Sequence, residues 1–158
     1  MSPEDHAVPS DYTAARHADP AEDHIGPFFV RAADGATDVA VTSAMRATAL
    51  HCNSMGVVHG GVLMTFADFT MSEAALHDGE PGEHCLTVSF DAQFVASARD
   101  GELLQGEAQI IRKSRTLTFV RGLIHTQRDR TRVELLAFSG VGKRVLADPK
   151  KPPPAAPA

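Results

Sequence analysis

The sequence predicts an α+β fold in which an antiparallel sheet of five or six strands wraps around one long central helix. Three observations predict it. Residues 62–76 form an apolar run in which Asp68 and Glu73 are the only charged residues. No proline occurs between Pro81 and Pro149, so the segment that follows this run has no residue that breaks strand pairing. Apolar and polar residues alternate in that segment, and no glycine-rich nucleotide-binding motif is present.

Length and composition indicate one globular domain without a nucleic-acid or membrane partner. The chain has 158 residues, of which 43% are hydrophobic, enough for a single core. Its net charge of −5 and the lack of a basic cluster argue against nucleic acid. No apolar stretch reaches transmembrane length, the N-terminus lacks the pattern of a signal peptide, and only Cys52 and Cys85 are present. We therefore expect a cytoplasmic protein.

The chain ends are expected to be loose, and order is expected over residues 25–146. Residues 1–24 mix Pro, Asp, Ala and His without apolar periodicity, which indicates a flexible arm with one short helical turn near Tyr12–His17. Residues 147–158 are rich in Pro and Ala and should be disordered. Short apolar or alternating runs predict strands at residues 28–30 and 38–48.

The long helix is expected to begin at His59-Gly60-Gly61 and to continue to Leu76, because a run of this length without proline exceeds the usual length of a strand. Strands are then expected at residues 86–95, 103–113, 117–127 and 133–144, joined by hairpins. In the first of these, alternation predicts one face with Leu86, Val88, Phe90, Ala92 and Phe94, and another with Thr87, Ser89, Asp91 and Gln93.

The helix carries two features that suit chemistry. His59-Gly60-Gly61 places two residues without side chains where the leading N–H groups have no helical partner, so an oxyanion can approach. Asp68 is a carboxylate on an apolar helix, which is costly unless it is paired or used. His59 and Asp68 are nine residues apart and should point to opposite sides. Two copies of the helix, one from each subunit, would be needed to bring both features to one substrate.

Asn53, Gly56, His59-Gly60-Gly61 and Asp68 together resemble the signature of hotdog-fold acyl-CoA thioesterases of the phenylacetate-pathway (PaaI-like) type, over about residues 25–146. The resemblance implies a hotdog fold and hydrolysis of acyl-CoA to free acid and CoA. It implies that Asp68 acts as nucleophile or general base and that Gly61, with Gly60, provides the oxyanion donor. It implies no cofactor beyond the CoA of the substrate, and a homodimer or homotetramer with sites between subunits.

The resemblance also suggests supporting residues. Asn53 would orient the carbonyl or the water, although a loop asparagine often only caps backbone groups. His59 would bond to backbone or orient the carbonyl, with proton transfer as the alternative. Thr87 matches a Ser or Thr that holds the attacking water in some members. The basic residues Arg112, Lys113 and Arg115 would lie near the CoA nucleotide, with Ser114 where the family often has glycine.

Other interpretations remain open from sequence. The same fold could bind acyl-CoA without hydrolysing it. An enoyl-CoA hydratase is disfavoured, because that branch has an Asp and a His near its helix start and this chain has Asn53 instead. Glu73 is a rival carboxylate, about 140° around the helix from Asp68. His51, Cys52 and His59 match no common zinc spacing, so no metal is expected.

Overall fold

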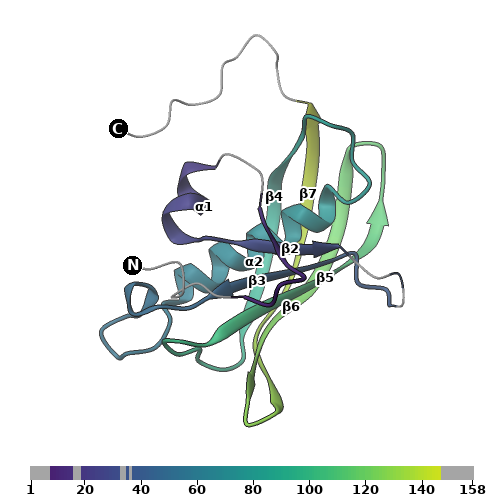
Figure 1. Ribbon diagram of the computed structural model, residues 1–158. Helices are drawn as coiled ribbons and strands as arrows, with labels where there is room; N and C mark the ends of the chain where they lie inside the picture. Colours follow the sequence, from purple (N-terminus) through teal and green to yellow (C-terminus); the bar gives the residue numbers. More distant parts are fainter. Residues whose placement is uncertain (1–7, 16–18, 33–34, 36, 147–158) are drawn as a thin grey trace.

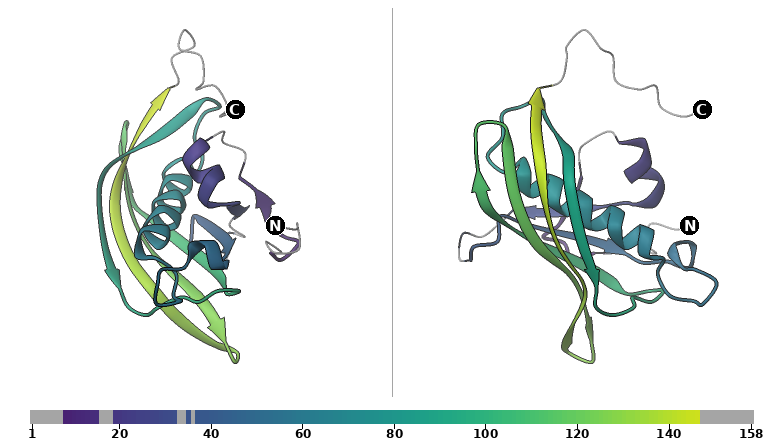
Figure 2. Two further views of the ribbon diagram at one scale, coloured as in Figure 1. Left: turned by 90° about the vertical axis from the view of Figure 1, so that its left-hand side faces the viewer. Right: turned by 180° about the vertical axis from the view of Figure 1, so that it is seen from behind.

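One long helix lies in the hollow of a curved antiparallel sheet (Figure 1). The structure is a computed structural model that describes residues 8–15, 19–32, 35 and 37–146. The helix is α2 (Gly60–Ala75), and the sheet has the strand order β1-β2-β3-β5-β6-β7-β4. Figure 2 shows the sheet bending around α2. The predicted α+β arrangement, an antiparallel sheet wrapped around one central helix, is confirmed.

The strands are β1 (Thr13–Ala14), β2 (Phe29–Ala32), β3 (Val41–Arg46), β4 (Glu83–Phe94), β5 (Leu103–Lys113), β6 (Leu117–Arg128) and β7 (Thr131–Leu146). A short helix, α1 (Pro20–Ile25), and a single turn of 3₁₀ helix, Ala49–His51, complete the described elements. The sheet thus has seven strands rather than the five or six predicted, because the two-residue β1 adds to the edge beside β2.

The connection after β4 differs from the prediction. A hairpin between β4 and β5 was expected, but β4 pairs with β7 at one edge of the sheet and β5 lies between β3 and β6. The segment between β4 and β5 passes the loop just before α2, where Val58 N–H donates to Ala98 O at 2.9 Å and Val57 pairs with Arg99. Turn residues alone do not reveal such a crossover, which leaves β4 with one free edge.

A bulge in β4 changes which side chains face the helix. The register with β7 shifts between Thr87 and Ser89. Thr87 therefore lies on the helix side together with Phe90, although strict alternation placed them on opposite faces. The β4 side chains are also more exposed than predicted for a strand with one buried face, since Leu86, Val88 and Phe94 are 55%, 59% and 56% exposed.

The helix α2 is buried on most sides, as predicted. Phe66 and Phe69 are buried and pack on Phe28, with ring centroids 5.5 and 4.9 Å from it. The helix approaches β5 closely at Gly106, where an added Cβ would lie 2.5 Å from Thr70 Oγ1. It begins at Gly60, within the predicted first turn His59-Gly60-Gly61, and His59 caps it.

The N-terminal segment contains more structure than the predicted arm. Thr13–Ala14 forms a strand instead of the helical turn expected there, and Tyr12 is buried, with its hydroxyl accepting a hydrogen bond from Gln105 Nε2 at 3.1 Å. Pro20–Ile25 forms α1. His17 and the tail from residue 147 lie outside the described residues. No described helix combines the length and the apolar character needed to cross a membrane.

Candidate active site

Asp68 and Thr87, both predicted from sequence, meet at the open edge of the sheet. Thr87 Oγ1 on β4 donates to Asp68 Oδ1 on α2 at 2.7 Å. Asp68 is half-buried, and this burial raises the pKa of its carboxyl, while the hydrogen bond from Thr87 opposes the increase. Desolvation makes a carboxylate a better base and nucleophile. The pair is thus a reactive group held in place by a neighbouring hydroxyl.

The start of α2 is closed by its own cap. His59 Nδ1 accepts a hydrogen bond from Gly61 N–H at 2.9 Å. A substrate oxygen can therefore reach this N–H only if the ring turns away or shares the donor, and the oxyanion role of Gly61 stays a prediction. The expectation that the His59 ring bonds to backbone is confirmed. At Gly60 a Cβ would lie 3.3 Å from the Phe94 ring, so close packing accounts for a small residue there.

Gly61 and Asp68 lie on the same outward stripe of α2. They are seven residues apart, which is nearly two full turns, so they share a face at a separation of about 10 Å along the axis. Gly61 is exposed. Thr65, which lies between Gly61 and Asp68 on this stripe, and Ser72, one turn after Asp68, are only partly buried. A thioester carbonyl is much smaller than this separation, so a single helix does not bring both groups to it.

Two predicted residues upstream of the helix have structural bonds. Asn53 Oδ1 accepts from Met55 N–H at 2.9 Å and from Val57 N–H at 3.4 Å, so it shapes the loop. His51 Nδ1 accepts from Thr48 N–H at 2.9 Å, and its Nε2 then donates to Ile25 O at 2.8 Å. Within the described residues, no three His, Cys, Asp or Glu side chains are grouped to hold a metal ion.

The predicted basic residues at the β5–β6 turn do not converge. Lys113 lies on the helix side and donates to His77 O, just past the end of α2, at 2.6 Å. Arg112 is the preceding residue on β5, so it points to the other face, beside Phe119. Arg144 was not predicted as part of this turn, and its guanidinium donates to the carbonyl oxygens of Ser114 and Arg115 at 2.7 and 3.0 Å. These bonds fix the turn in place of the glycine that the resemblance led us to expect.

Glu22 on α1 was also not predicted from the sequence. This side chain is half-buried, and burial together with nearby carboxylates raises its pKa to about 7. Asp19 Oδ1 caps α1 by accepting from the N–H groups of Ala21 and Glu22, and Pro20 is its first residue. An Asp followed by Pro is a start signal for a helix, but the absence of apolar periodicity hid it.

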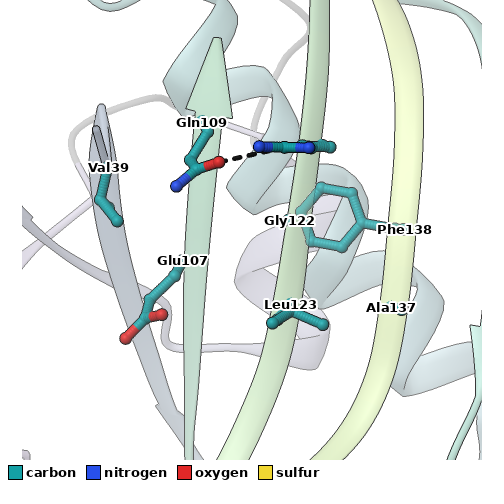
Figure 3. A pocket seen from close by; sticks show the side chains of 8 residues that line it. Val39, Glu107, Gln109, Gly122, Leu123, Ala137 and Phe138 are labelled. Atoms are coloured by element: carbon teal, nitrogen blue, oxygen red, sulfur yellow. Dashed lines mark hydrogen bonds between the residues drawn. The ribbon is translucent and has the colours of Figure 1, made fainter. Parts of the chain in front are cut away.

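A separate hollow lies on the outer face of the sheet (Figure 3). It measures about 370 Å³ and is lined in part by Leu123 and Ala137, with Arg121 Nε donating to Gln109 Oε1 at 3.0 Å on one side. Arg121 and Leu123 alternate along β6 with Val120 and Ile124, which are buried against α2, so the hollow is on the far side of the sheet from Asp68. It does not belong to the Asp68–Thr87 site.

Comparison with known proteins identifies the class. Residues 55–133 match the family model of the thioesterase superfamily. A protein of Pseudomonas aeruginosa, PA0474, which is named provisionally as an esterase, is 30% identical over 119 residues, 75% of this chain and 87% of that protein. The chain therefore belongs to the thioesterase superfamily.

Solved structures share the fold. The E. coli PaaI protein from the phenylacetic acid degradation operon has a TM-score of 0.67 at 19% identity, covering 81% of this chain and 86% of that chain. A hypothetical thioesterase from Streptococcus pneumoniae, solved with coenzyme A, has a TM-score of 0.61 at 15% identity, covering 75% and 86%. The predicted hotdog fold and the resemblance to PaaI-like thioesterases are confirmed.

Proposed function

We propose that this protein hydrolyses acyl-CoA thioesters, with Asp68 as the reactive carboxylate. The observation that carries the proposal is the half-buried Asp68 held by Thr87 at 2.7 Å, within a chain of the thioesterase superfamily. Asp68 attacks the carbonyl directly, or takes a proton from the water that attacks. The sulfur of CoA is the leaving group, and no cofactor is required.

We further propose that the site forms between two copies of the chain paired through β4. This strand has one free edge, contains no proline and exposes Leu86, Val88 and Phe94. Proteins usually protect such an edge, often with lysine or proline, and this twelve-residue edge strand contains neither, which suits pairing with a second copy. An antiparallel pair of β4 strands would extend the sheet across a two-fold axis.

The contacts between α2 and β4 support one position for the proposed axis. Asp68 contacts Thr87, and Gly60 lies against Phe94, so α2 and β4 run in opposite directions past each other. The midpoint of β4 between these contacts falls near Phe90, and the matching midpoint of α2 falls near Met64. A two-fold axis there would place the helix start of one copy beside Asp68 of the other.

In that arrangement the Gly61 N–H of the partner helix polarises the thioester carbonyl while Asp68 reacts with it. His59 must then release the N–H or share it with the substrate oxygen. Lys113 lies on β5, and its ammonium group reaches the end of α2. It is available to a CoA phosphate if it gives up its bond to His77 O. The binding of acyl-CoA without hydrolysis is the outcome if Gly61 N–H stays with His59 throughout.

Release of free thiol from a panel of aryl, short, medium and long acyl-CoA esters tests the proposal. The wild-type chain should release CoA, and Asp68→Asn, which keeps the size of the side chain, should lower kcat by at least about 100-fold. Glu73→Gln on the same helix is the matched control and should keep most of the activity. Intact acyl-CoA after long incubation, or full activity in Asp68→Asn, would overturn the assignment.

A further inference from the structure

The short helix α1 packs on the outward side of α2. Figures 1 and 2 show α1 on the side of α2 that faces away from the sheet, and the two helices are in contact. The cap by Asp19 fixes the start of α1, and the bond from His51 Nε2 to Ile25 O, at 2.8 Å, ties its end to the loop before α2. The position of α1 is thus set at both ends.

The residue that α1 turns inward is unusual. Of its six residues only Glu22 and Ile25 are partly buried, three positions apart on one face, and the others are exposed. Ile25 packs against the hydrophobic core, as expected of an inward residue. Glu22 instead brings a carboxyl towards Asp68 and Glu73 on α2, two groups of the same charge. A carboxyl in this place costs stability, and a function would explain it.

Carboxyls so placed cannot all be ionised at neutral pH. Burial, then the charges of Asp19, Glu73, Asp68 and Asp23, raise the pKa of Glu22 to about 7. Among the other groups nearby, Cys85 on β4 has a thiol whose pKa is raised by burial, and His51 bonds through both ring nitrogens. For Asp68 only burial and the Thr87 bond shift the pKa. Asp68 therefore ionises first, and Glu22 retains a proton.

We propose that Glu22 is the proton-transfer residue of this site, and this inference rests on the proposed thioesterase function. Two neighbouring carboxyls that hold their protons differently form an acid–base pair, with Asp68 as the ionised member and Glu22 as the acid. The C–S bond of the tetrahedral adduct breaks with its electron pair going to sulfur, and the proton of Glu22 goes to that sulfur. Free CoA thiol leaves, and Glu22 becomes a carboxylate.

The second half of the reaction returns the proton. If Asp68 was the nucleophile, water attacks the acyl carbon of the mixed anhydride, its proton goes to Glu22, and Asp68 leaves as carboxylate. If Asp68 was the base, the proton that it took from water passes to Glu22. In both routes one thioester and one water give one carboxylic acid and one thiol, and both side chains return to their starting states.

The structure predicts how this role appears in kinetics. Because Asp68 must be ionised and Glu22 protonated, kcat/KM should fall on both sides of an optimum, and the fall at high pH should lie near pH 7. Glu22→Gln keeps the size and hydrogen-bonding capacity of the side chain but supplies no acidic proton. Its kcat should be lower by about 10- to 100-fold with CoA esters, and the fall near pH 7 should disappear.

Varying the leaving group of the substrate distinguishes two roles for Glu22, that of a proton donor and that of a residue that only stabilises α1. With thioesters of a much more acidic thiol, such as an aryl thiol, sulfur needs no proton, so Glu22→Gln should approach the wild-type rate. His24→Gln, at an exposed position of the same helix, leaves the carboxylates around Glu22 unchanged, so it is the control and should behave as wild type with both leaving groups. Melting curves verify that each variant folds.

If Glu22→Gln retains the wild-type rate, or is equally slow with both leaving groups, the inference is wrong. If the wild-type chain hydrolyses CoA esters and Asp68→Asn does not, the proposed function survives that result. If the wild-type chain hydrolyses none of the thioesters, the proposed function fails, and the role of Glu22 falls with it.

Discussion

Replacing Thr87 with valine tests the Asp68–Thr87 pair. The two side chains have nearly the same shape, so the substitution removes one hydroxyl and its 2.7 Å bond to Asp68 Oδ1. A hydrogen bond to a charged group is worth roughly 1.5–3 kcal/mol, and partial exposure of this site favours the lower end. About 1.4 kcal/mol corresponds to one pKa unit, so the pKa of Asp68, already raised by burial, should rise by about one further unit.

The direction in which the pH profile shifts follows from which protonation state of Asp68 reacts. Asp68 acts as a carboxylate, so activity falls when the pH drops below its pKa, and a higher pKa moves this fall to higher pH. In kcat/KM profiles with the best acyl-CoA of the panel, Thr87→Val should shift the acidic limb upward by about one pH unit. Thr87→Ser keeps a hydroxyl and should leave the limb near its wild-type position. An unchanged limb in Thr87→Val would refute the reasoning.

Three further predictions concern packing, assembly and charge. Gly106→Ala forces a Cβ to 2.5 Å from Thr70 Oγ1 and should lower the free energy of unfolding in urea by about 1–3 kcal/mol. An unaltered unfolding midpoint would contradict the close helix–sheet contact. Val88→Lys at the free edge of β4 should convert the proposed dimer to monomer in analytical ultracentrifugation and abolish activity, whereas a stable dimer would argue against pairing through β4. Burial alone would raise the pKa of Glu102, but the bonds from Arg128 lower it. Arg128→Ala should therefore reduce the free energy of unfolding by about 1–2 kcal/mol near pH 7, and by less as the pH falls through that lowered pKa. An equal loss of stability at low pH would contradict the ion pair.

Much of the fold could be predicted because its signals are local. The bounds of β5 were predicted to the residue, and those of β6 to one residue, since alternation and turn residues mark both. The length and apolar character of residues 62–76 indicated a helix buried on most sides. The crossover between β4 and β5 could not be predicted, because a chain that turns at Arg99 can pair with either neighbour, and long-range contacts decide which.

The candidate site was predicted in its residues more than in its geometry. Asp68 stands out as a charge on an apolar helix, and Thr87 was placed only by resemblance. The bulge at Val88 brings Thr87 to the helix side, and no sequence pattern announced it. The cap that occupies Gly61 N–H depends on the conformation of the His59 ring, and the place of Glu22 depends on how α1 packs. Tertiary contacts of this kind are invisible in local periodicity.

Mixing two inactive variants tests the shared site most directly. One chain carries Asp68→Asn, and the other carries Gly61→Val, which obstructs the helix start at an exposed position. If each site combines the Asp68 of one copy with the helix start of the other, a mixed dimer contains one intact site and one doubly damaged site. After unfolding and refolding together in equal amounts, half of the dimers are mixed, so about a quarter of wild-type activity should return. Each variant refolded alone should remain inactive, and the absence of recovery in dimers shown to be mixed would contradict a site built from two chains.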